Sequence, residues 1–339
     1  METPRRQFLR VTAGGLVAAS GVATRPWPVR AQGPTVKIGS AVLADFGLVG
    51  PILVALEKGY FRAAGVNVEF QPFRGGPDLV KQVMGNQILI GVTGATDVPV
   101  FRAEGVAIRY VATTIEGNSF TFNVVPGITK VADLKGKSIG VTRVGANTWV
   151  FAQIIARQQG WDPERDVKIL GLGGNDAQLA AAARGEIHAF IFGDAGAVSE
   201  LEGKSRILFR LDTVTPKWIS TAAYCTDEAI RSQKPAIVAA LRGFFQGARF
   251  IRESPKEAQA IAAKTLGWTE PAVARAYEIS GPLLSKDGTI SVEAIDVMQA
   301  TMVEFKAQKQ KVPTADCYTS EFTPVRLGET SLNLITKRL

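Results

Sequence analysis

Short runs rich in β-branched residues alternate with longer segments of helical periodicity through most of this chain. The first four runs lie at 36–40, 66–70, 88–93 and 108–113, with helical patterns at 51–61 and 78–84 between them. A second set lies at 138–142, 167–172, 189–192 and 207–211, with helical patterns at 148–159 and 176–184. Such alternation is typical of parallel or mixed α/β sheets. The pattern therefore predicts two α/β units in tandem.

Beyond Asp227 the pattern becomes helical. Amphipathic segments follow one another at 235–252, 255–265, 270–279 and 292–308. They leave no strands for a third sheet, so we expect them to pack on one of the two α/β units.

Two loops echo each other about a hundred positions apart. Gly94-Ala95-Thr96-Asp97 and Gly193-Asp194-Ala195-Gly196 each follow an apolar run that is preceded by a glycine, Gly85 or Gly185. Since ligands bind beyond the carboxyl ends of strands in α/β sheets, these loops should face a shared crevice. Ordinary helix-glycine-strand punctuation explains the echo equally well.

The first 31 residues have the three regions of an export signal. Arg5-Arg6-Gln7-Phe8-Leu9-Arg10 precedes an apolar stretch, and a small residue at Ala31 offers a cleavage position. The paired arginines indicate the twin-arginine subtype, although Pro4 replaces the usual hydroxyl residue, and this leaves the general secretory route open. The stretch is shorter than the roughly 20 residues that span a bilayer. We predict a periplasmic protein whose signal peptide is cleaved near Ala31.

Charge and cysteine content exclude several classes of protein. The formal charge of +8 includes five Arg and one Glu of the predicted signal, so the remainder carries about +4 without a basic run, and we expect no nucleic-acid partner. About 308 residues after the signal exceed one usual hydrophobic core. Cys225 and Cys317 either pair or remain buried free thiols. No spacing typical of a metal or cofactor site occurs, so none is expected.

Two strand-to-helix turns favour an anionic ligand. Unpaired N–H groups at a helix start, together with the helix dipole, attract negative charge. The turn 142–148 also carries hydroxyls at Thr142 and Thr148 and a guanidinium at Arg143, and the turn 74–77 begins with Arg74. The alternative is that Asn147 or Thr148 caps its helix and that both arginines are solvated.

Aromatic and acidic residues at strand ends provide other ligand contacts. We expect Phe46 and Phe120 to contact the apolar part of a ligand, and Trp149 and Phe192 to be structural. Asp45 and Asp194 could accept from an amine or amide, or bond their own backbone as turn residues do.

Several motifs resemble those of the substrate-binding components of ABC importers. The resemblance rests on Lys58-Gly59-Tyr60-Phe61, Ala64-Gly65-Val66-Asn67-Val68, Phe73-Arg74-Gly75-Gly76, the stretch 131–141 and Ala183-Arg184-Gly185-Glu186-Ile187. The chain is most similar to the branch named for thiamine-pyrimidine synthesis proteins (SsuA/THI5-like), whose members also bind nitrate, taurine and other sulfonates.

The resemblance implies a type II periplasmic binding protein fold, in which two lobes joined by crossing strands close on a small molecule. Lobe one would combine 32–120 with 220–339, and lobe two would be 121–219. A monomer would deliver its solute to a membrane permease and ATPase complex. The predicted ligand-binding residues are Asp45, Phe46, Arg74, Gly75, Gly76, Gly94, Ala95, Thr96, Phe120, Thr142, Arg143, Gly145, Ala146, Asn147, Thr148, Gly193 and Asp194.

Catalytic relatives of the same fold are the main alternative. A desulfinase-like lyase would need a Cys nucleophile in the first crevice loop, but the loop Ser40 to Gly50 contains neither Cys nor His. A pyrimidine-precursor enzyme would need a reactive His and a Cys-rich motif, whereas this chain has one His and two distant Cys. We therefore expect no catalytic residues. A periplasmic ligand sensor is a third class.

Overall fold

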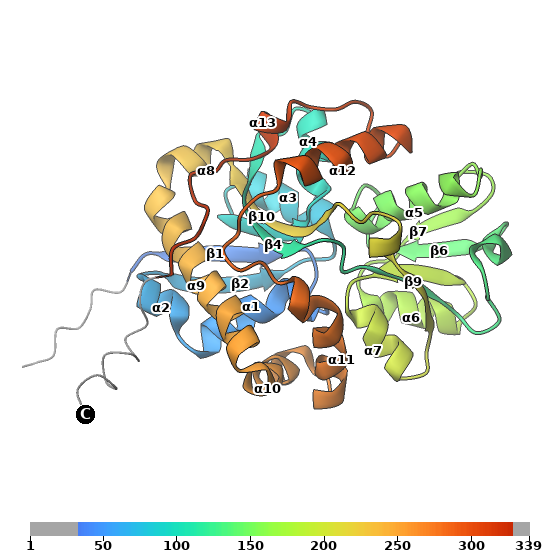
Figure 1. The fold of residues 1–339 in the computed structure, drawn as a ribbon, viewed down its shortest axis with the longest axis horizontal. Helices are drawn as coiled ribbons and strands as arrows, with labels where there is room; N and C mark the ends of the chain where they lie inside the picture. Colours follow the sequence, from blue (N-terminus) through green and yellow to red (C-terminus); the bar gives the residue numbers. More distant parts are fainter. Residues whose placement is uncertain (1–32, 328–339) are drawn as a thin grey trace, which may run out of the picture. The chain divides into compact units, whose positions relative to one another are not determined.

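A computed structural model of the protein describes residues 33–327, so the predicted export signal lies outside the described residues. Within this range the strands form two five-stranded sheets with helices packed around each (Figure 1). The two-lobe α/β fold predicted from the sequence is confirmed. We call the parts built on these sheets lobe one and lobe two.

The lobe-one sheet has the strand order β2-β1-β3-β10-β4. Strand β1 pairs in parallel with β2 and β3, whereas β10 runs antiparallel between β3 and β4. The strands are β1 (Thr35–Ser40), β2 (Asn67–Pro72), β3 (Ile90–Gly94), β4 (Ile108–Glu116) and β10 (Ile219–Thr226).

The lobe-two sheet repeats this plan in the order β7-β6-β8-β5-β9. Its antiparallel member is β5, which lies between β8 and β9. The strands are β5 (Thr121–Val124), β6 (Ser138–Val141), β7 (Lys168–Gly171), β8 (Ala189–Phe192) and β9 (Arg206–Arg210).

The chain crosses between the lobes twice, from β4 to β5 and from β9 to β10. Side chains tie the two crossings together: the Ser119 and Ser220 hydroxyls lie 2.7 Å apart, and the Asn118 amide donates to the Thr215 hydroxyl at 2.6 Å. These crossings lie near the predicted lobe boundaries at 120 and 220. A hinge movement of the lobes at these crossings remains a prediction.

Helices follow the predicted order, with two corrections to their ends. The first begins at Phe46 rather than 51, because the Asp45 side chain caps it by accepting from the Leu48 N–H at 3.0 Å. It ends at Glu57 because Gly59 adopts a left-handed conformation (φ 69°). The helices of this region are α1 (Phe46–Glu57), α2 (Tyr60–Ala64), α3 (Gly76–Met84) and α4 (Asp97–Ala103).

Lobe two and the C-terminal part contain the remaining helices. The last long helix ends at Glu304 rather than 308, since Lys306 has a positive φ of 57°. The short helices α4 and α7, which open directly from the two echoing loops, were not predicted. The helices are α5 (Asn147–Gln158), α6 (Asn175–Ala183), α7 (Ala195–Leu201), α8 (Asp227–Ser232), α9 (Lys234–Glu253), α10 (Pro255–Leu266), α11 (Glu270–Ser280), α12 (Val292–Glu304) and α13 (Thr314–Cys317).

The C-terminal helices pack on lobe one, as expected. Helix α9 lies against α1 and α2, and α10 and α11 also contact α1. Helix α11 reaches α7 of lobe two as well, where Arg275 and Glu200 form an ion pair at 3.3 Å. The two lobes therefore meet outside the crossings too (Figure 1).

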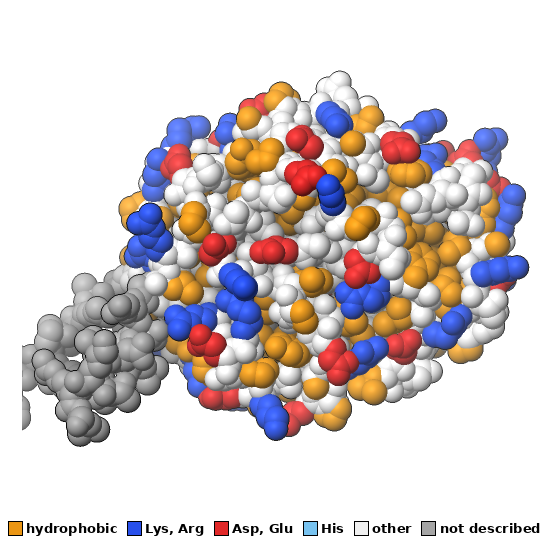
Figure 2. All heavy atoms as spheres, in the orientation of Figure 1, with side chains coloured by type: hydrophobic (Ala, Val, Ile, Leu, Met, Phe, Trp, Pro, Cys, Tyr) orange, Lys and Arg blue, Asp and Glu red, His pale blue; other side chains and the backbone are white. Residues whose placement is uncertain are grey.

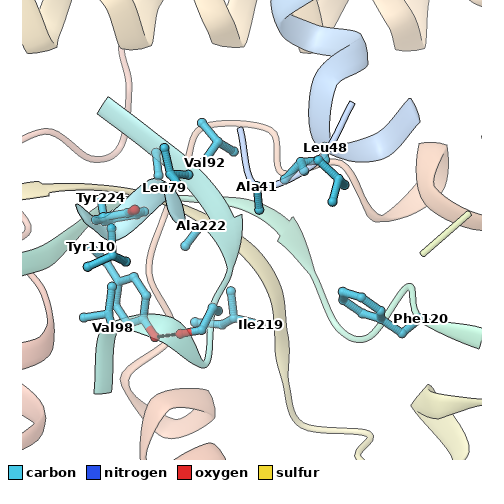
Figure 3. Packing of buried hydrophobic residues seen from close by; sticks show 14 of the residues in the cluster. Ala41, Leu48, Leu79, Val92, Val98, Tyr110, Phe120, Ile219, Ala222 and Tyr224 are labelled. Carbon is cyan, nitrogen blue, oxygen red and sulfur yellow. Dashed lines mark hydrogen bonds between the residues drawn. The ribbon is translucent and has the colours of Figure 1, made fainter. Parts of the chain in front are cut away.

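Large apolar side chains fill the lobe-one core. Tyr110 and Tyr224 are fully buried. Tyr224 lies beside Leu79, the Tyr110 hydroxyl donates to the Ala95 carbonyl, and Phe120 lies apart from this group (Figure 3). On the surface, basic and acidic side chains are interspersed (Figure 2). Among the described helices, none has the length and apolarity needed to cross a membrane.

Candidate functional site

A small cavity of about 40 Å³ lies between the two lobes. Both lobes supply its walls, through strand ends, helix starts and the crossing segments. Its apolar side consists of alkyl and aromatic side chains, and its polar side of hydroxyls, one amide and one carboxyl. The lining residues are Ala41, Val42, Asp45, Leu48, Gly75, Gly76, Thr93, Gly94, Phe120, Thr142, Ala146, Asn147, Thr148, Phe192, Gly193 and Thr221.

Two helix N-termini from opposite lobes open onto this cavity. Gly75 and Gly76 start α3 in lobe one, and Ala146, Asn147 and Thr148 start α5 in lobe two. Neither start has a side-chain cap, so its first N–H groups remain without an acceptor from a capping residue. Positive partial charge from both helix ends is therefore directed toward one space.

Asn147 adds a donor to this space. Its side-chain oxygen accepts from the Thr96 hydroxyl at 2.9 Å across the lobes, while its Nδ2 is buried without a partner. A buried amide without an acceptor is costly, and a ligand oxygen would satisfy it. Thr142 and Thr148 stabilise the turn before α5, because the Thr148 hydroxyl accepts from the Thr142 N–H at 3.0 Å.

Three glycines allow the lobes to approach closely. A Cβ on Gly94 would lie 2.4 Å from the Asn147 Cβ, and one on Gly193 would lie 2.0 Å from Asp45 Oδ2. A Cβ on Gly75 would lie 2.6 Å from the Arg143 Cγ. In every case the neighbour belongs to the other lobe. The two echoing loops thus contain glycine where the closed lobes touch.

Three buried carboxyl groups surround the cavity. Burial, reinforced by the nearby charge of Asp194, raises the pKa of Asp45 well above its usual value. Burial also raises the pKa of Asp194 to about 6 and that of Asp97, which lies behind Gly76, to about 7. The raised pKa favours the neutral, protonated form of Asp45, which lessens its repulsion of an anion in the cavity.

Many of the predicted ligand-binding residues meet at the cavity. They are Asp45, Gly75, Gly76, Gly94, Phe120, Thr142, Ala146, Asn147, Thr148 and Gly193.

Other predicted residues lie elsewhere, for identifiable reasons. Phe46 is fully buried, and its ring packs against that of Tyr277 with the ring centroids 6.2 Å apart. It therefore does not line the cavity. Ala95 is buried under the Tyr110 hydroxyl, and Thr96 acts through Asn147. Gly145 provides the left-handed turn (φ 83°) before α5 without lining the cavity.

The predicted arginines do not line the cavity. Arg74 is exposed. The Arg143 guanidinium donates instead to Asp78 Oδ2 at 2.8 Å, which links the start of α3 to the turn before α5. Asp194 does not line the cavity either. Its carboxylate accepts hydrogen bonds from the backbone N–H groups of Phe46 and Gly47 in lobe one.

Some lining residues were not predicted from the sequence. Ala41, Val42, Leu48, Thr93 and Thr221 carry no distinctive motif, and they come from the end of β1, the first turn of α1, the end of β3 and the start of β10. Phe192 was expected to be structural but lines the cavity. Cys225 and Cys317 are free and buried in this structure.

Comparison with known proteins agrees with this geometry. A family model described as NMT1/THI5 like matches residues 48–258, more than half of the chain. The chain belongs to the NMT1/THI5-like family. The resemblance predicted from the motifs is thereby confirmed. No curated protein matches this chain significantly.

Solved structures share the fold at low identity. The alkanesulfonate-binding protein SsuA from Xanthomonas axonopodis pv. citri, bound to MOPS, is 20% identical, with 84% of this chain and 96% of that chain covered and a TM-score of 0.69. The periplasmic nitrate-binding protein NrtA from Synechocystis PCC 6803 is 12% identical, with 90% and 85% covered and a TM-score of 0.66. A DszB mutant in complex with biphenyl-2-sulfinic acid is 15% identical, with 90% and 99% covered and a TM-score of 0.59.

Proposed function

We propose that this protein is the periplasmic solute-binding component of an ABC importer and binds a small anion between its lobes. The observation that carries the proposal is the convergence of the α3 and α5 N-termini on one cavity, with the unpartnered Asn147 amide beside them. Helix ends and neutral donors bind oxyanions without a paired cation. This is consistent with a lining that includes no Lys or Arg among the described residues.

The solute class follows from the two sides of the cavity. Donors at the helix starts suit a sulfonate, nitrate or carboxylate group, while Val42, Leu48, Phe120 and Phe192 suit an alkyl or aromatic body. The sulfonate-binding and nitrate-binding proteins of the same fold support this class. Pyrimidines remain in the panel because of the family to which the chain belongs. Delivery to a permease and ATPase complex by a monomer is part of the proposal.

Calorimetry with the purified protein tests the proposal. The panel contains alkanesulfonates, taurine, nitrate, aromatic carboxylates and aminopyrimidines. We expect an anion of the panel to bind, and Asn147→Asp to weaken it at least tenfold, because a negative side chain would replace the donor. The matched control is Asn175→Asp. Asn175 is also the buried first residue of a lobe-two helix, but it does not line the cavity. Equal losses in both variants, or no binding by any anion, would contradict the proposal.

A catalytic role has less support than binding. The described chain shares its fold with DszB, but its first crevice loop carries no nucleophile of the cysteine type. The Cys317 thiol has a pKa raised by burial to about 11, and burial raises the pKa of Cys225 further. A thiol held in its protonated form is a poor nucleophile. Turnover of a sulfinate substrate by the purified protein would favour the catalytic alternative. A neighbouring gene for a membrane kinase rather than a permease would favour a sensor.

A further inference from the structure

The Asp194 carboxylate lies in lobe two, yet its hydrogen-bond donors come from lobe one. Asp194 Oδ1 accepts from the Phe46 N–H at 2.9 Å, and Oδ2 accepts from the Gly47 N–H at 2.7 Å. Oδ2 also accepts from the Ser280 hydroxyl at 2.7 Å. Asp194 itself is fully buried. One side chain of lobe two therefore joins the start of α1 to the end of α11.

These contacts complete the N-terminus of α1. The N–H groups of the first three residues of a helix have no intrahelical acceptor. Here Asp194 accepts from Phe46 and Gly47, and Asp45 accepts from Leu48. The helix start thus holds a negative charge at the position where its dipole favours one. In the closed lobes, α1 has no free N-terminal donor for a solute.

The neighbouring carboxyl group is arranged to tolerate this charge. The side chains of Asp45 and Asp194 lie close together, and burial together with the nearby Asp194 charge raises the pKa of Asp45. The higher pKa of Asp45 favours the proton on Asp45 and the negative charge on Asp194. Gly193 allows the approach, because a Cβ there would collide with Asp45 Oδ2.

A buried carboxylate is stable only when donors surround it. For Asp194 those donors are present only while the lobes are in contact, since Phe46, Gly47 and Ser280 all belong to lobe one. We propose that Asp194 is an interlobe latch, which takes the place of a ligand anion at the start of α1 and favours the closed lobes before any solute binds. The solute anion is then bound by α3 and α5 alone.

Small-angle scattering of the ligand-free protein tests the latch, because opening of the lobes increases the radius of gyration. We expect Asp194→Asn to shift the ratio of closed to open molecules by about tenfold or more toward open. The amide has only one accepting oxygen, whereas the carboxylate accepts at two. Ser280→Ala should cause a smaller shift in the same direction. Gly193→Val, which separates the lobes by bulk, shows the radius of the open form.

The matched control is Glu200→Gln. Glu200 is another lobe-two acid that contacts lobe one, through Arg275, but this pair is partly exposed. Glu200→Gln should leave the radius of gyration unchanged. The latch is overturned if Asp194→Asn and Ser280→Ala both scatter like the parent protein while Gly193→Val opens, or if Glu200→Gln opens the lobes as much as Asp194→Asn does. Circular dichroism confirms that each variant is folded. Failure of the whole solute panel to bind would overturn the proposed function and leave this ligand-free result intact.

Discussion

The Thr96 hydroxyl of lobe one donates to the Asn147 side-chain oxygen of lobe two at 2.9 Å, beside the interlobe cavity. This bond fixes which end of the Asn147 amide is satisfied within the protein. The Nδ2 group is left free to bind a solute. In the proposed binding mode Thr96 positions the Asn147 amide, although its own side chain does not line the cavity.

Thr96→Val tests this role because it keeps the shape and removes the donor. We expect the affinity for the bound anion of the panel to fall about five- to tenfold, which corresponds to the loss of one hydrogen bond. Calorimetry measures the change. Thr113→Val is the control, since the Thr113 hydroxyl is buried without any partner. Comparable affinity losses in the two variants would argue against positioning by Thr96.

Gly94→Ala should prevent full closure. The new Cβ would lie 2.4 Å from the Asn147 Cβ, closer than side-chain atoms pack, so one lobe must move away from the other. We expect a larger radius of gyration in the presence of the solute and an affinity at least tenfold weaker. Gly174→Ala is a suitable control because its Cβ would meet nothing within 4 Å and its φ of −65° suits alanine.

Arg143→Ala should change solute affinity less than about threefold. The Arg143 side chain is 40% exposed and pairs with Asp78, and partly exposed ion pairs contribute little. The sequence suggests that Arg143 pairs with a charged group of the ligand, whereas the structure pairs it with Asp78. Arg74→Ala, at an exposed position, provides the comparison. A tenfold or greater loss specific to Arg143→Ala would place the guanidinium against the solute after all.

Asp97→Asn should flatten the dependence of stability on pH. Burial raises the pKa of Asp97 to about 7, whereas the unfolded chain has the usual value of 3.8. The folded state therefore keeps a proton that the unfolded state releases. This contribution to stability is complete below pH 3.8 and is lost as pH rises through 7.

Urea unfolding at pH 5 and pH 8 measures the effect. Between these values Asp97 should lower the free energy of unfolding of the parent protein by about 3 kcal/mol at most. In Asp97→Asn this part of the decrease should vanish, while the parts due to Asp45 and Asp194 remain. An identical decrease in both proteins would show that Asp97 is not protonated at pH 5.

Local sequence patterns predicted most of the fold. The runs that became β1, β6 and β8 agree with the observed strands within one residue, because β6 and β8 are buried throughout and the apolar residues of β1 are buried. The start of α1 was missed because its cap depends on Asp45, and a lone Asp in a small-residue loop is ambiguous. Helices α4 and α7 were missed because seven residues carry too little periodicity.

The sequence by itself determined the turns that could reach a ligand. Glycines after strands and helix starts without strong caps are local properties, and they led directly to Gly75, Gly94, Asn147 and Gly193. A family resemblance could also be recognised from short motifs, because these define the turns common to the fold.

Only the tertiary structure decided which charges remain for a ligand. The side chains of Arg143 and Asp194 extend across the cleft, and their partners, Asp78 and the start of α1, are more than sixty positions away along the chain. Sequence patterns report local geometry, whereas an ion pair or a shared proton depends on distance and burial in the folded state. For that reason an arginine predicted to bind the solute proved to join the lobes, and a turn aspartate proved to cap a helix of the other lobe.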